Sequence, residues 1–128
     1  MSRPSAIDVA FPACPKSAPQ LRRTLRVFLE ARHLDAARIH DVLLAVGEAA
    51  GNAIEHAYRG SGGTVRLQAS LDDLRLVIEV RDSGRWRLDG DPARGRGLGI
   101  MRALVDRVSI ENTRAGTSVR LEVGLTRA

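Results

Sequence analysis

The segment 36–59 constrains the fold most, because it places an apolar residue at every third or fourth position, the period of an α-helix. Asp35 precedes this segment as a candidate N-cap, and the turn residues 60–63 follow it. A long helix with one apolar stripe needs a second layer that buries the stripe. The stripe consists of Ile39, Val42, Leu43, Val46, Ala50, Ala53, Ile54 and Ala57.

The rest of the chain supplies that second layer. We expect strands at 7–11, 64–70, 74–81, 106–111 and 117–123, and further helices at 17–34 and 98–105. Turns at 72–73 and 113–116 make two hairpins of the last four strands. The polar, glycine-rich segment 82–97 is expected to be a long loop, of the kind that often forms a functional lid. This order predicts a two-layer α/β sandwich, with a mostly antiparallel mixed sheet and its helices on one face.

Length and composition exclude several classes of protein. The 128 residues suit one domain, 1–128, in which 1–16 form an N-terminal strand or arm. The net charge of +5 is dispersed among carboxylates, and 3% aromatic residues cannot build a stacking platform for single-stranded nucleic acid. Cys14 is the only cysteine, so no internal disulfide forms. With no apolar run long enough for a membrane span, we expect a cytoplasmic protein without direct nucleic-acid or membrane contacts.

Polar residues on the long helix are the first candidates for chemistry. Glu48 and Asn52 are four residues apart, so they share one helix face. Gly47 and Gly51 in the same stretch weaken the helix, which suggests that another group approaches this backbone closely. The alternative is a solvated polar face, with glycines that make room for a neighbouring strand.

Two further motifs follow the third predicted strand. Asp82-Ser83-Gly84 lies at its end, where a carboxylate can accept a hydrogen bond from an exocyclic amine and a glycine allows close approach of a ligand. The segment 94–99, which contains Gly95, Gly97 and Gly99, precedes or opens the next helix, a position suited to anion binding. The alternatives are a plain turn and a glycine-rich hinge. The hydroxyl of Thr117, at the start of the last strand, is a weaker candidate for ligand contact.

In this order the motifs resemble those of the anti-sigma-factor serine/threonine protein kinases. These kinases belong to the Bergerat-fold ATPase superfamily of gyrase, Hsp90, histidine kinases and MutL. The segment 48–58 is similar to the family's N-box, 82–86 to its first glycine box, 95–101 to its second and Gly116-Thr117 to its closing motif. The resemblance covers residues 21–123, nearly the whole chain.

The resemblance implies a role for each candidate residue. Glu48 would be the general base, and Asn52 would coordinate Mg²⁺. Asp82 would bind the adenine amino group of ATP, with Gly84 and Thr117 beside it. The lid over the phosphates would contain Arg94, Gly95, Arg96, Gly97, Leu98 and Gly99.

The family also implies partners. The expected function is an anti-sigma factor that binds a sigma factor and phosphorylates a STAS-domain antagonist, as a homodimer formed through the first helix and its strand. The alternative is a non-catalytic nucleotide-binding module that sequesters a regulatory protein. A third hypothesis, a nucleic-acid binder that uses the arginines, predicts steep salt dependence and no effect of ATP.

Overall fold

A computed structural model describes residues 5–59, 63–83, 92–114 and 116–125. Within them, residues 5, 56–59 and 92–96 are described as backbone only. Predictions that fall on other residues, Gly84 among them, lie outside the described part of the chain.

Five strands form one sheet. They are β1 (Ser5–Pro12), β2 (Thr64–Leu71), β3 (Arg75–Asp82), β4 (Arg107–Thr113) and β5 (Gly116–Gly124). Their order across the sheet is β1-β2-β3-β5-β4, and all four pairings of these strands are antiparallel. Both predicted hairpins are present, and β1 is an edge strand as expected. The expected mostly antiparallel sheet is therefore antiparallel throughout its described strands.

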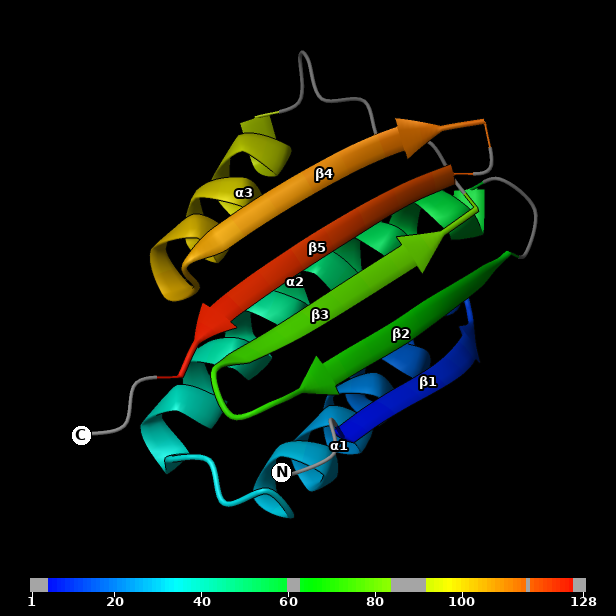
Figure 1. Ribbon diagram of the computed structural model, residues 1–128. Coiled ribbons are helices and arrows are strands. Elements are labelled where there is room, and N and C mark those ends of the chain that lie inside the picture. Colours follow the sequence, from blue (N-terminus) through cyan, green and yellow to red (C-terminus); the bar gives the residue numbers. More distant parts are fainter. Residues whose placement is uncertain (1–4, 60–62, 84–91, 115, 126–128) are drawn as a thin grey trace.

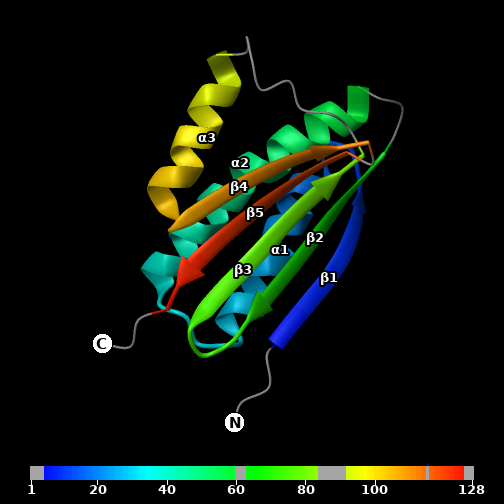
Figure 2. The same cartoon turned by 45° about the horizontal axis from the view of Figure 1, so that its top comes forward.

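Three helices cover one face of this sheet. They are α1 (Ser17–Glu30), α2 (Ala36–Arg59) and α3 (Pro92–Leu104). Figures 1 and 2 show α1 and α2 behind the sheet, with α3 packed beside α2 near β4. The predicted two-layer α/β sandwich with helices on one face is confirmed. No described helix is long and apolar enough to span a membrane.

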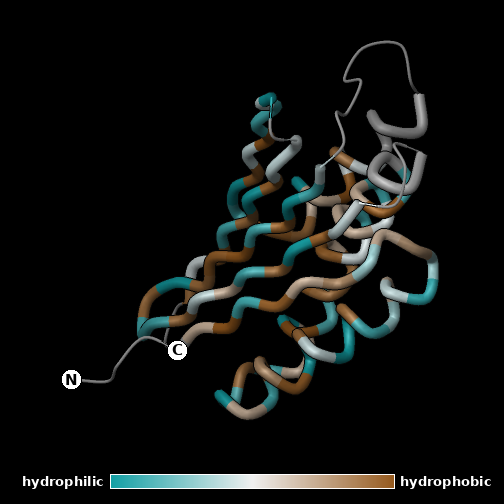
Figure 3. Tube along the Cα trace, turned by 90° about the vertical axis from the view of Figure 1, so that its right-hand side faces the viewer, coloured by the Kyte–Doolittle hydropathy of each residue, from teal (hydrophilic) through white to brown (hydrophobic). Residues whose placement is uncertain are grey.

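The core lies between the two layers. Residues along β2, β3 and β5 alternate between buried and exposed, as Figure 3 shows by their hydropathy. Leu67, Ile78 and Leu121 each expose none of their surface and face the helices. The apolar stripe of α2 meets them, because Val42, Val46 and Ala53 are fully buried. The stripe predicted from the sequence is thus the side of α2 that faces the sheet.

The first helix is shorter than the spacing of its apolar residues predicts. It ends at Glu30, and residues 31–33 form a turn. The reason is local: His33 adopts a left-handed backbone conformation with φ of 60°, which no α-helix accommodates. Leu34, directly after this turn, still packs against the core, which explains why it continues the apolar pattern.

The third helix begins earlier than predicted. The sequence placed residues 82–97 in a loop, whereas β3 includes Asp82 and α3 begins at Pro92. Proline suits the first turn of a helix, where its missing N–H loses no hydrogen bond. The glycines favoured a loop, but packing against α2, with Met101 fully buried, overrides that preference.

Candidate functional site

One group of candidate residues lies at the end of the sheet. Asp82 and Thr117 are directly opposite each other on β3 and β5, and both are buried. Residues paired across antiparallel strands have their Cβ atoms about 5 Å apart on the same face. The sequence singled out both residues separately, and the sheet brings them together as predicted.

Gly116 fixes how closely β3 and β5 approach at this end. Its φ is 136°, and a Cβ atom added there would fall on the carbonyl oxygen of Asp82. Only glycine adopts this backbone conformation without strain. Asp82, Gly116 and Thr117 also border a cavity of about 270 Å³, but its other lining residues, among them Glu79, Arg81 and Ser118, lie on the sheet face away from the helices.

Asn112 joins this group, although sequence analysis did not identify it. The Thr117 hydroxyl donates a hydrogen bond of 2.7 Å to Oδ1 of Asn112, its cross-strand partner on β4. Next to it, the Thr113 hydroxyl donates to the carbonyl oxygen of Gly116 at 3.2 Å. The signal was available in the sequence, because a hairpin that turns at 113–116 pairs Asn112 with Thr117.

Glu48, Asn52 and Gly97 form the second group. A Cβ atom added to Gly97 would lie 3.3 Å from Oε2 of Glu48 and 3.3 Å from Nδ2 of Asn52. The two side chains therefore converge on one point of the α3 backbone. The prediction that they share one helix face is confirmed, and the second glycine box packs directly on that face.

Within the described part of the chain, neither glycine of α2 has a close neighbour that requires it. A Cβ atom at Gly51 would meet nothing within 4 Å, and one at Gly47 would make ordinary contact with the Arg22 side chain, at 3.7 Å from Cδ. Among the described residues, the close approach that the sequence suggested at these glycines is therefore absent. Glycine 51 instead leaves an open, exposed surface on α2 beside Glu48.

The remaining lid residues lie in α3 and not in a loop. Arg94, Gly95 and Arg96 fall in the part of α3 described by its backbone only, so their predicted phosphate contacts stay predictions. Leu98 packs against the core, while Gly99 is exposed with nothing within 4 Å of an added Cβ. The prediction that 95–97 precede a helix N-terminus is wrong, because these residues are inside the helix.

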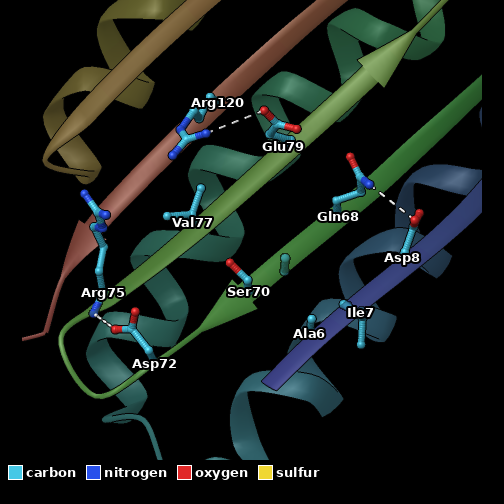
Figure 4. A pocket seen from close by; sticks show the side chains of 11 residues that line it. Ala6, Ile7, Asp8, Gln68, Ser70, Asp72, Arg75, Val77, Glu79 and Arg120 are labelled. Carbon is cyan, nitrogen blue, oxygen red and sulfur yellow. Dashed lines mark hydrogen bonds and ion pairs between the residues drawn. The ribbon is translucent and has the colours of Figure 1, made fainter. Parts of the chain in front are cut away.

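The larger hollow, about 590 Å³, lies on the sheet face away from the helices and contains none of the candidate residues. Figure 4 shows its charged rim, where Gln68 donates to Asp8 and Arg120 pairs with Glu79. The Arg66 guanidinium, 2.7 Å from Asp8, holds the pKa of that carboxyl below its usual range. Because its charges are paired and exposed, we assign no chemistry to this face.

The described residues fit a magnesium ion that arrives with a phosphate ligand. Among them, no cluster of three His, Cys, Asp or Glu side chains could hold a metal alone. Mg²⁺ favours oxygen ligands and is usually held by one or two protein groups together with substrate phosphates. The amide oxygen of Asn52, on the same helix face as the Glu48 carboxylate, is a donor of this kind.

The five-stranded sheet with its helices, together with the pairs Asp82–Thr117 and Glu48–Asn52, is typical of one family of ATPase domains. Residues 11–123 match the family model of the histidine kinase-like ATPase domain, and the chain belongs to that family. The resemblance inferred from the four motifs is thereby confirmed.

Individual proteins similar to this chain indicate a more specific group within the family. The chain is 33% identical to the anti-sigma F factor of Clostridium acetobutylicum, over 63% of this chain and 66% of that protein. It is 27% identical to the serine-protein kinase RsbW of Bacillus subtilis, over 83% of this chain and 78% of that protein. A solved structure of the RsbU and RsbW domains of a Mycobacterium tuberculosis protein matches with a TM-score of 0.81 and 27% identity, and covers 97% of this chain and 33% of that one.

Proposed function

We propose that this protein is an ATP-dependent serine/threonine protein kinase that acts as an anti-sigma factor. It would bind a sigma factor and phosphorylate a STAS-domain antagonist. The observation that carries the proposal is the convergence of Glu48 and Asn52 beside Gly97, on a fold shared with relatives named anti-sigma F factor and serine-protein kinase. A carboxylate base beside an amide that can bind a metal ion suits phosphoryl transfer to a hydroxyl, which depends on positioning and charge neutralisation.

Each residue has a task in this reaction. The Asp82 carboxylate accepts a hydrogen bond from the adenine amino group, and Thr117 lies beside it. Asn52 holds Mg²⁺, which neutralises phosphate charge when bound. Glu48 takes the proton of the acceptor hydroxyl while the hydroxyl oxygen bonds to the γ-phosphorus and ADP leaves with the electrons of the broken bond.

The proposed function includes the association of two copies of the chain. We infer a homodimer through α1 and β1, because β1 is an edge strand whose outer side pairs with no other described strand. A sigma-factor partner would place the protein in the cytoplasm. Sedimentation velocity tests the dimer: the prediction is one species of twice the chain mass of 13.9 kDa, and a monomer at micromolar concentration would contradict it.

The kinase proposal is tested by replacing the base. Purified STAS-domain proteins of the same genome are incubated with the protein and radiolabelled Mg·ATP, and phosphoserine or phosphothreonine is measured. We expect Glu48→Gln to lower transfer by about 100-fold or more while ATP binding persists. Glu55→Gln, an exposed glutamate on the same helix, is the matched control and should transfer normally. Full transfer by Glu48→Gln would overturn the role of Glu48.

The same experiment addresses the non-catalytic alternative. If the unaltered protein captures a STAS-domain protein or a sigma factor in the presence of Mg·ATP but produces no phosphoprotein, it is a nucleotide-binding module that sequesters its partner. Phosphotransfer by the unaltered protein excludes that function.

A further inference from the structure

Three polar residues form a row across the end of the sheet. Asp82 pairs with Thr117 on β3 and β5, and Thr117 pairs with Asn112 on β4 and β5. The alternation along β3 and β5 places Asp82 and Thr117 on the helix-facing side. Asn112 is exposed, and its pairing with Thr117 places it on the same side. Thr117, in the middle of the row, exposes 2% of its surface, so its hydroxyl orientation is set by its neighbours.

The hydrogen bond from Thr117 to Asn112 determines where the Thr117 hydroxyl donates and where it can accept. A hydroxyl group has one hydrogen atom to donate and two lone pairs that accept. At 2.7 Å, Oδ1 of Asn112 takes the hydrogen atom of Thr117. What Thr117 can then offer to a group beside Asp82 is a lone pair, so the hydroxyl and the carboxylate both act as acceptors.

We propose that Asn112 is a positioning residue that makes the nucleotide site selective for adenine, by holding Thr117 as an acceptor beside Asp82. This inference rests on the proposed function, in which Asp82 binds the adenine amino group. An amino group is a donor and matches two acceptors. A purine with a carbonyl oxygen at the same position presents an acceptor to both, and it cannot recover a hydrogen bond from Thr117 because that hydrogen atom is committed to Asn112.

Inosine triphosphate is the direct probe, because its base carries a carbonyl oxygen where adenine carries the amino group. Titration calorimetry of the full chain with Mg·ATP and with Mg·ITP gives the ratio of the two dissociation constants. We expect the unaltered protein to prefer ATP. In Asn112→Ala the Thr117 hydroxyl no longer donates its hydrogen atom to Asn112 and can donate it to the carbonyl oxygen, so the preference for ATP should fall by about 3- to 10-fold.

Three variants separate positioning from a structural role. Asn112→Asp keeps an acceptor oxygen at the same place and should keep the preference, although both nucleotides bind more weakly to the added charge. Thr113→Val removes the neighbouring hydrogen bond to Gly116 and should leave the preference unchanged. In a Thr117→Val background, Asn112→Ala should cause no further loss, because Asn112 acts through that hydroxyl.

The outcomes distinguish this inference from the function on which it rests. If the unaltered protein binds neither nucleotide, the proposed ATP site is wrong and the inference fails with it. If it binds ATP but shows no preference, or if Asn112→Ala changes the ratio by less than about 2-fold, the ATP site stands and the role of Asn112 is wrong. An effect of Asn112→Ala that persists without the Thr117 hydroxyl also overturns it.

Discussion

At Gly116 the backbone of β5 runs against the backbone of Asp82, and both the contact with the Asp82 carbonyl group and φ of 136° disfavour any residue other than glycine. This contact sets the position of the Asp82 carboxylate and the Thr117 hydroxyl, which are the predicted adenine-binding groups. At the scale of single residues, the geometry of the site therefore depends as much on a missing side chain as on the polar groups themselves.

We predict that Gly116→Ala is strongly destabilising. The added Cβ would coincide with the Asp82 carbonyl oxygen, a rigid backbone atom, and φ of 136° is strained for alanine. The expected loss in the free energy of unfolding is about 2–4 kcal/mol, measured by urea denaturation. Gly99→Ala, where nothing lies within 4 Å of an added Cβ, is the control. Equal stability of the two variants would contradict the close contact.

At the scale of elements, α2 and α3 show why part of the site was predictable and part was not. The apolar stripe of α2 follows from sequence spacing alone, and with it the shared face of Glu48 and Asn52. The start of α3 does not, because Gly95, Gly97 and Gly99 disfavour helix locally. The packing that compensates, with Gly97 against α2 and Met101 in the core, is visible only in three dimensions.

A second prediction concerns Gly51 in the interior of α2. Its surface is exposed and a Cβ atom would meet nothing, so Gly51→Ala should raise the free energy of unfolding by about 0.5–1 kcal/mol through helix propensity. Thermal unfolding in the absence of nucleotide measures this. A lower melting temperature would contradict the open surface at Gly51.

The β2–β3 hairpin has a pH-dependent turn. The amides of Leu74 and Arg75 donate to Asp72, and these bonds hold the pKa of Asp72 below its ordinary value of 3.8. Because the folded pKa is lowered, this stabilisation is complete above about pH 5 and is lost as the pH falls through the lowered value. Stability measured from pH 5 downwards should therefore fall less steeply in Asp72→Asn.

Asp73→Asn serves as the control for this turn, since it changes the charge equally but keeps both bonds to Asp72. The same pH profile for Asp72→Asn and the unaltered chain would show that the turn does not depend on the ionised carboxylate.

At the scale of the whole molecule, the fold class could be predicted because element type and order follow from local periodicity. The order of the strands in the sheet could not be predicted in this way. β5 lies between β3 and β4, and β1 pairs with β2 although α1 and α2 separate these two strands in the sequence. These pairings determine that Asp82, Thr117 and Asn112 form one row. Sequence analysis identified Asp82, Thr117 and the hairpin that pairs Thr117 with Asn112, whereas Asn112 itself and the contact between β3 and β5 come from the structure.

Asp82 and Thr117, with Glu48 and Asn52, are proposed to form a nucleotide site, and calorimetry of ATP binding tests this. Purified protein is titrated with ATP by calorimetry, with and without Mg²⁺, beside Asp82→Asn. We expect ATP to bind more tightly with Mg²⁺, and we expect Asp82→Asn to weaken binding by about 10-fold or more, because the carboxylate that accepts from the adenine amino group is lost. No binding at millimolar ATP, or equal binding by Asp82→Asn, would contradict it.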